Sequence, residues 1–258
     1  NEPNEIEDVS WIRPMKYVGI WWGMHIRKNS WSAGPTHGAT TDEAKKYIDF
    51  ASANNIDAVL IEGWNKGWES WGSDDAFDFI TPYDDFRLEE VAKYAKENGI
   101  ALIGHHETGG NVPMYEKYID DAFDLYQQLG IHAVKTGYAG PIRPEGQHHH
   151  GQWMVRHYRS VVEKAAEHQI MIDAHEPIKP TGIRRTWPNM MTREGVRGQE
   201  WNAWSEGNPP SHTCILPFTR MLAGPLDYTP GIFDVLFEEY KQPERVHTTL
   251  AHQLALFV

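Results

Sequence analysis

Two apolar segments of the chain, at residues 100–107 and 170–176, end in a histidine followed by a glutamate. Short apolar runs of this kind predict buried strands, which here would carry Glu107 and Glu176 at their carboxyl ends. Parallel α/β folds place their catalytic groups at this end of the strands. The two segments therefore predict that both glutamates belong to one active site.

Further polar residues stand at predicted strand ends or in the loop after the fifth strand. Carboxylates beside histidine and lysine, in a chain with 11 Trp and 11 Tyr, suit glycoside hydrolysis. That reaction needs a protonated acid for the leaving oxygen, an ionised base for a water molecule, and hydrogen-bond donors for the sugar hydroxyls. These further candidates are Glu62, His105, Lys135, His175, Glu194 and Glu200.

Carboxylates gathered at one site repel one another, so positive charge is needed to hold them together. A hard cation such as Ca²⁺, which takes oxygen ligands, would supply that charge. Glu176, Glu194 and Glu200 are near enough in the sequence to share one ion. They are the predicted calcium ligands.

Zinc is a competing interpretation, because His105, His106 and His175 offer imidazole ligands. Adjacent residues of a strand point to opposite faces, so at most one of His105 and His106 faces the barrel interior. We expect His106 to be a packing residue. The three histidines at 148–150 are expected to form a solvated loop rather than a metal site.

Structural roles are the alternative for three of the polar residues. Glu62 or Lys135 could form half of a buried ion pair, and Asp227 could cap a local turn. Two strands that both end in His-Glu are harder to explain by packing. The pair of Glu107 and Glu176 therefore carries the prediction of an active site.

The elements that must position these residues alternate between strand and helix about seven times. This pattern, with no glycine-rich phosphate motif after the first strand, predicts an α/β fold of the (β/α)8 TIM-barrel class. The sequence ends inside the seventh helix, so residues 1–258 are expected to be one catalytic barrel domain truncated before its eighth strand. Predicted strands are 17–24, 58–64, 100–107, 132–138, 170–176, a weak one within 190–198, and 226–228; predicted helices begin at Thr40 and near 88, 115, 152, 215 and 246.

Composition excludes several classes of protein. The net charge of −12, with no run of Lys or Arg, argues against a nucleic-acid partner. The longest apolar stretches fall short of the roughly 20 residues that span a bilayer, so no membrane insertion is expected. The first residue is Asn1, so any signal peptide is expected to lie outside this sequence. The lone Cys214 is expected to be a small buried group.

Eight spaced motifs resemble glycoside hydrolase family 97 over nearly the whole chain. Together they make a chance match very improbable. They are Tyr17-Val18-Gly19-Ile20-Trp21-Trp22, Ile61-Glu62-Gly63-Trp64-Asn65, His105-His106-Glu107-Thr108, Gly151-Gln152-Trp153-Met154, Ala174-His175-Glu176-Pro177, Lys179-Pro180-Thr181-Gly182, Arg197-Gly198-Gln199-Glu200 and the segment 224–231.

The resemblance implies a calcium-dependent hydrolase of α-glycosides, periplasmic and involved in starch utilisation. Retaining members of the family carry an Asp nucleophile at the end of the fourth strand, whereas inverting members have a Gly. Gly137 stands at that position here, so the chain is similar to the inverting α-glucosidase branch. In that branch, Glu200 matches the general acid, and Glu107 and Glu176 match the bases that activate water.

The same resemblance implies the remaining roles. The residues that match sugar-contacting positions are Glu62, His105, Lys135 and His175, and those that match calcium ligands are Glu176, Glu194 and Glu200. The expected substrate is an α-glucoside oligosaccharide, with maltose the simplest example. The family also has a β-sandwich before the barrel, which supplies a further calcium ligand, and a small β domain after it. Because neither domain is in this sequence, the isolated chain is expected to bind calcium weakly and to hydrolyse poorly.

Three other functions stay open at the level of sequence. An α-galactosidase or another α-glycosidase of the same family is the nearest of them. A zinc-dependent barrel hydrolase would use His105, His175 and an acidic ligand. A non-catalytic carbohydrate-binding domain would keep the aromatic cleft without turnover.

Overall fold

A single parallel sheet of six strands forms the centre of the protein. The computed structural model describes residues 3–242 and 245–257. The strands follow one another in sequence order across the sheet, and each pairs in parallel with the next. They are β1 (Tyr17–Ile20), β2 (Ala58–Ile61), β3 (Ala101–Glu107), β4 (Ala133–Gly137), β5 (Met171–Ala174) and β6 (Met190–Arg193).

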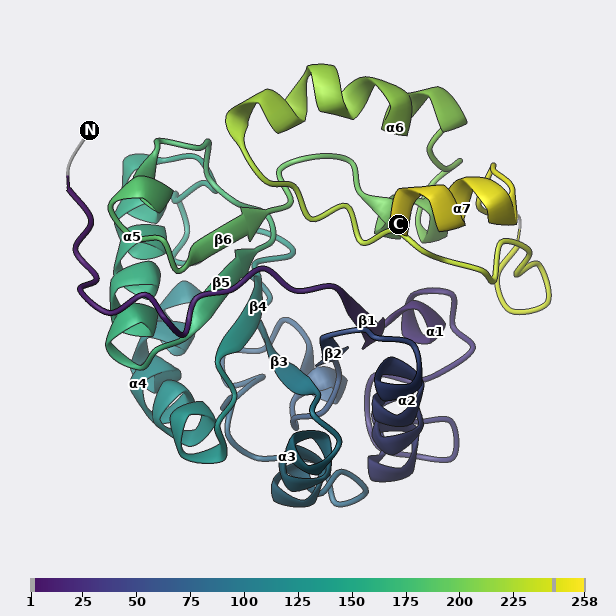
Figure 1. Ribbon diagram of the computed structural model, residues 1–258, viewed down its shortest axis with the longest axis horizontal. Coiled ribbons are helices and arrows are strands. Elements are labelled where there is room, and N and C mark those ends of the chain that lie inside the picture. Colours follow the sequence, from purple (N-terminus) through teal and green to yellow (C-terminus); the bar gives the residue numbers. More distant parts are fainter. Residues whose placement is uncertain (1–2, 243–244, 258) are drawn as a thin grey trace.

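Helices cover the outer face of this curved sheet (Figure 1). The four long ones are α2 (Thr41–Ala53), α3 (Leu88–Glu97), α4 (Val112–Leu129) and α5 (Gln152–Glu167). The shorter elements are α1 (Trp22–His25), α6 (Pro210–Ile215), α7 (Leu250–Phe257) and the 3-10 turns η1 (Trp68–Ser70), η2 (Ile183–Arg185), η3 (Gln199–Ala203), η4 (Leu216–Phe218) and η5 (Arg220–Ala223). The α6 and α7 helices lie side by side, joined by a 2.9 Å hydrogen bond between Thr213 and His252.

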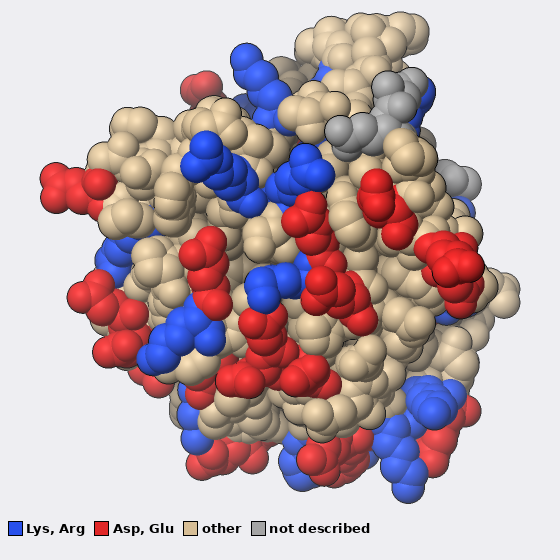
Figure 2. Space-filling model, turned by 90° about the vertical axis from the view of Figure 1, so that its left-hand side faces the viewer, with Lys and Arg blue, Asp and Glu red and all other residues tan. Residues whose placement is uncertain are grey.

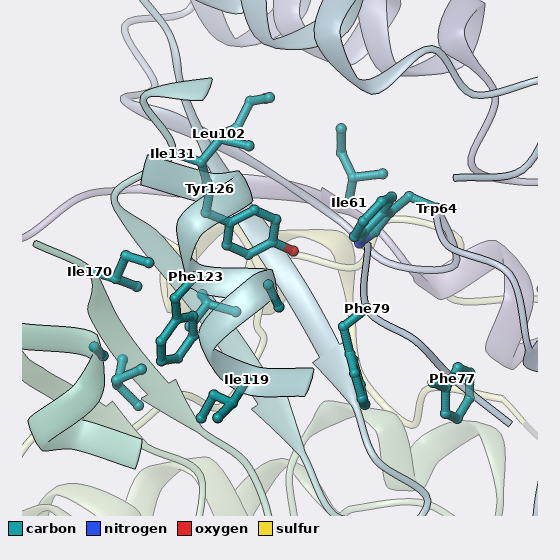
Figure 3. Close-up of a cluster of buried hydrophobic side chains, with 14 of the residues drawn as sticks. Ile61, Trp64, Phe77, Phe79, Leu102, Ile119, Phe123, Tyr126, Ile131 and Ile170 are labelled. Carbon is teal, nitrogen blue, oxygen red and sulfur yellow. The ribbon is translucent and has the colours of Figure 1, made fainter. Parts of the chain in front are cut away.

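Local sequence signals explain the ends of the long helices. The hydroxyl of Thr40 accepts from the Glu43 backbone N–H at 3.2 Å, as expected for an N-cap. Asn111 caps α4 in the same way, and Gly130 ends it in the left-handed conformation at φ 72°. Between α4 and the sheet, Phe123 and Tyr126 pack into a large apolar core (Figure 3).

The inward residues of the strands form two layers because side chains alternate between the faces of a strand. The lower layer is apolar and includes Leu60, Ile103 and Met171, all buried. Two positions further along β3, β4 and β5 the residues become polar. On β3 to β5 these upper residues are His105, Lys135 and Asp173, which are paired by register across the sheet.

The structure confirms the α/β barrel fold and corrects several of the predicted elements. The first strand ends at Ile20, because residues 22–25 turn into α1. The weak sixth strand is real but covers only β6. Residues 226–228 form no strand; Leu226 makes one isolated parallel bridge to Arg193. Pro225 and Pro230 flank this segment, and proline has no N–H to extend a ladder.

Three further predictions in the C-terminal part of the chain were wrong in detail. The helix expected over 215–222 consists of the 3-10 turns η4 and η5, since Pro217 interrupts the α-helical hydrogen bonds. The last helix begins at Leu250 rather than Val246. Cys214 is exposed on α6, not buried.

The distribution of charged side chains on the surface agrees with a sequence that has no run of Lys or Arg. On the face in Figure 2, acidic and basic side chains are interspersed, and the basic ones form no continuous field. Among the described residues, no helix is both long and apolar enough to cross a membrane.

Candidate active site

A cavity of about 610 Å³ opens at the carboxyl ends of the strands. That volume is within the usual range of small-molecule sites, roughly 300–1,000 Å³. All the predicted catalytic and sugar-contacting residues line it: Glu62, His105, Glu107, Lys135, His175, Glu176 and Glu200. The structure therefore brings these residues together, whereas their individual roles stay predictions.

Lys135 is the central cation of the cavity. Its ammonium lies 2.6 Å from Glu62 Oε1 and 3.2 Å from Glu200 Oε1, and the lysine is 3% exposed. Removing one partner of such a buried pair leaves an uncompensated charge. Lys135 and Glu62 are thus both a buried ion pair and part of the cavity wall, so the structural and functional interpretations are compatible.

Glu107 is held at the end of β3 by backbone donors. Its Oε1 accepts from the N–H of Gly109 at 2.7 Å and of Ala139 at 3.2 Å. Its Oε2 occupies the space beside Gly137, where a Cβ atom would lie only 2.0 Å away. Burial, followed by the charge of Glu176, raises the pKa of Glu107 to about 8.

Glu176 follows β5 in an unusual backbone conformation. Its φ is 44°, in the left-handed region that non-glycine residues seldom adopt and that is often found at functional sites. Its Oε2 accepts from the Tyr138 N–H at 2.7 Å, and its own N–H points at Glu194 Oε2 at 3.4 Å. Burial raises its pKa, against the opposing charge of His175.

Glu200, on η3, carries the opposite shift. Burial disfavours its charge, but Lys135, His25 and His175 outweigh burial and lower the pKa of Glu200 to about 2. At neutral pH the described side chains therefore favour a protonated Glu107 and an ionised Glu200. For Glu200 to act as the general acid and Glu107 as the base, Glu200 must be protonated and Glu107 ionised before the reaction.

The predicted calcium ligands gather beside the cavity. Ligand atoms of Glu194 and Glu200, two of the three predicted ligands, lie within 4.8 Å of each other and of a ring nitrogen of His175. Among the described residues the carboxylate of Glu176, the third, is in neither group of clustered ligand atoms, and Glu176 contacts Glu194 through its backbone N–H. Burial and the neighbouring carboxylates raise the pKa of Glu194 to about 7, against the opposing charges of His175 and Lys135. A donor set dominated by crowded carboxylate oxygens fits a hard divalent cation.

The histidines fit zinc less well. His105 faces the cavity, and its ring stacks on Trp68 with centroids 5.9 Å apart. His106 points to the opposite side, where its Nδ1 lies 3.0 Å from the Tyr115 hydroxyl among aromatic rings. Among the described residues, neither of the two groups of three clustered ligand atoms contains either histidine. Residues 148–150 lie in a surface loop as expected.

The buried His106 gives a prediction about acid stability. Burial lowers its pKa to about 3, below the roughly 6.5 of an unfolded histidine. As the pH falls from 6.5 towards 3, only the unfolded chain takes up this proton, so His106 destabilises the fold over that window and not above it. We expect His106→Phe to reduce the slope of unfolding free energy against pH by up to about 1.4 kcal/mol per unit there.

Urea unfolding at several pH values between these limits measures that slope. His150→Gln, in the exposed loop, is the control and should leave it unchanged. An identical slope for the parent and His106→Phe would show that His106 does take up the proton while folded.

Sequence reasoning missed part of the cavity wall. His25 lies there because α1 follows β1 directly, and its ring packs against Trp31 and Trp204. Asp227, which was considered only as a cap, does not line the cavity but lies 2.8 Å from Nε2 of His175, which does. The signal for Asp227 was its place within the predicted seventh strand, residues 226–228.

Comparisons with known proteins agree with this geometry. The family model described as Glycoside hydrolase 97 matches residues 21–196. Solved structures of a family 97 enzyme from Pseudoalteromonas sp. strain K8, in complex with panose or acarbose, are 51% and 52% identical to the chain, each with a TM-score of 0.91. They align with 100% of this chain and 41% of theirs.

A curated relative is named as a galactosidase. The retaining alpha-galactosidase of Bacteroides thetaiotaomicron is 28% identical over 99% of this chain. The chain spans 36% of that relative's length. The match over residues 21–196, together with the shared fold, shows that the chain belongs to glycoside hydrolase family 97.

Proposed function

We propose that the protein is an inverting, exo-acting α-glucosidase that acts on malto-oligosaccharides with the help of calcium. The observation that carries the proposal is the contact between Glu107 and Gly137. Because Glu107 Oε2 lies 2.0 Å from where a Cβ of residue 137 would stand, this arrangement leaves no room for an Asp nucleophile there. A water molecule is then the nucleophile, as inversion requires.

In this proposal each carboxylate has a separate task. Glu200 donates a proton to the glycosidic oxygen, while Glu107 and Glu176 hold the attacking water and take its proton. Inversion requires acid and base carboxyls on opposite sides of the bond, roughly 6.5–9.5 Å apart, to admit that water. Glu62, His105, Lys135 and His175 bind the sugar hydroxyls.

Calcium would be held by Glu176, Glu194 and Glu200. A bound cation supplies positive charge that keeps these three carboxylates together. Burial, together with the charges of neighbouring carboxylates, raises the pKa values of Glu176 and Glu194. A bound cation would relieve the repulsion between these carboxylates. A periplasmic location is proposed on the family resemblance alone.

A retaining α-galactosidase is the second candidate, because the curated relative described above has that name at 28% identity. Support for a glucosidase comes from the structures with 51% and 52% identity, which were solved with panose and acarbose bound. NMR of the first anomer released separates the two mechanisms. The proposal expects the β-anomer of glucose from an α-glucoside, and an initial α-anomer would overturn inversion.

Calcium affinity gives a prediction of its own. The family resemblance assigns one more carboxylate ligand to a preceding β-sandwich, which lies outside the 258 residues. We therefore expect the 258-residue chain alone to bind calcium weakly, and calorimetry should detect no micromolar site. A micromolar or tighter site would show that Glu176, Glu194 and Glu200 suffice, and Glu194→Gln should then abolish it.

A further inference from the structure

Below the floor of the cavity, one carboxylate holds one of the cavity's histidines. Asp227 Oδ2 lies 2.8 Å from His175 Nε2, and both residues are buried, at 7% and 3% exposure. The other ring nitrogen of His175 faces the carboxylates of the site, with Nδ1 at 3.7 Å from Glu194 Oε2 and 3.8 Å from Glu200 Oε1. The ring of His175 therefore lies between Asp227 on one side and the carboxylates of Glu194 and Glu200 on the other.

Asp227 is itself held in place by other contacts. Its Oδ2 also accepts from the Tyr17 hydroxyl at 2.9 Å, and its Oδ1 accepts from the Thr229 N–H at 3.1 Å. Hydrogen bonding to His175 and the charges of His175 and Lys135 hold the pKa of Asp227 below its usual range, although burial opposes this. Asp173 is the other carboxylate that faces this pair.

This arrangement fixes which ring nitrogen meets the substrate. An ionised carboxylate can only accept, so the hydrogen of the contact must sit on Nε2 of His175. Nδ1 is then the nitrogen presented to the cavity. A partner on the far nitrogen is the usual way in which proteins set the tautomer and orientation of a functional histidine.

We infer that Asp227 is a positioning residue for the reaction, which acts by holding His175 so that Nδ1 faces the sugar and the carboxylates. The inference rests on the proposed function, in which His175 binds a sugar hydroxyl. Asp227 lines no part of the cavity among the described residues, and its hydrogen bond to His175 is its direct contact with a residue that does.

A double-mutant cycle with Asp227→Asn and His175→Ala, made in the whole protein that contains these 258 residues, tests this inference. We expect Asp227→Asn to reduce kcat/KM by about 100-fold, the upper end of the effect seen for groups that orient a metal-bound histidine. In the His175→Ala background the same change should have almost no further effect, within about twofold. The inference would be overturned if the effects of the two substitutions on kcat/KM multiply in the double mutant. It would also be overturned if the Asp227→Asn variant is as active as the parent.

Asp124→Asn is the matched control. Asp124 also contacts a histidine Nε2, that of His168 at 3.1 Å, but neither residue lines the cavity. Its replacement should leave kcat/KM unchanged. If Asp227→Asn does not fold, Tyr17→Phe, which removes one donor from Asp227, is expected to give a smaller loss in kcat/KM that also disappears in the His175→Ala background.

Proton NMR separates this inference from the proposed function, because it needs no substrate. A hydrogen shared between a buried carboxylate and an imidazole gives a strongly low-field resonance, which should disappear in His175→Ala and persist in Asp124→Asn. If no such resonance is found, the pairing is wrong even in an active enzyme. If the resonance is present but the parent cleaves no α-glycoside, the proposed function fails and Asp227 still orients His175.

Discussion

Glu200→Gln should lower kcat/KM for maltose by about 10²–10⁴-fold, the usual contribution of general acid catalysis, with little change in substrate binding. The amide keeps the shape of the carboxyl group but has no proton to give. Glucose release and calorimetric binding of maltose to the variant measure the two effects. Glu97→Gln, on the exposed end of α3, is the matched control and should behave as the parent.

The leaving group of the substrate tells whether Glu200 is the acid. The dinitrophenolate group of a dinitrophenyl α-glucoside leaves without protonation. The Glu200→Gln variant should therefore recover most of the parent's activity on that substrate. Glu107→Gln should stay inactive on both substrates, because the attacking water still needs a base. The opposite pattern would make Glu107 the acid, in line with its pKa of about 8 and the value of about 2 for Glu200.

Gly137→Ala should reduce kcat/KM by about 100-fold or more, since a misplacement of 1 Å can have that effect. The added Cβ would lie 2.0 Å from Glu107 Oε2, so the carboxylate has to leave its position. Its hydrogen bond from Ala139 N–H would then be lost or distorted. Kinetics on maltose and the thermal midpoint of unfolding separate an effect on the site from one on the fold.

Gly151→Ala is the control for this substitution, because a Cβ at 151 has no neighbour nearer than 3.2 Å. It should leave kcat/KM unchanged. A Gly137→Ala variant with full activity would mean that Glu107 works from another position, and the case for inversion would lose its main support.

The part of the site that lies on strands could be predicted from the sequence because alternation along a strand is strict. His105 and His106 are adjacent, and this alone indicated that one faces the cavity and the other the helices, as the structure shows. The ends of β3 and β5 likewise located Glu107 and Glu176. In these cases local pattern and tertiary position agree.

Features that depend on distant contacts were not predictable in this way. The low pKa of Glu200 depends on Lys135, 65 positions earlier in the chain, together with His25 and His175. The partnership of His175 with Asp227 spans 52 positions and involves a segment that forms no regular strand. The short α1 helix interrupts an apolar run that would otherwise continue as a strand, and its Trp22 packs against the distant Phe237.

The two layers of inward residues place apolar packing and polar cavity groups at separate positions of the same strand. On β4, Ala133 belongs to the apolar layer and Lys135, two positions further on, to the polar one. Evolution can therefore rewrite the upper positions, and with them the preferred sugar, while the lower ones continue to close the barrel. Divergent specificities on one scaffold are the natural outcome of that separation.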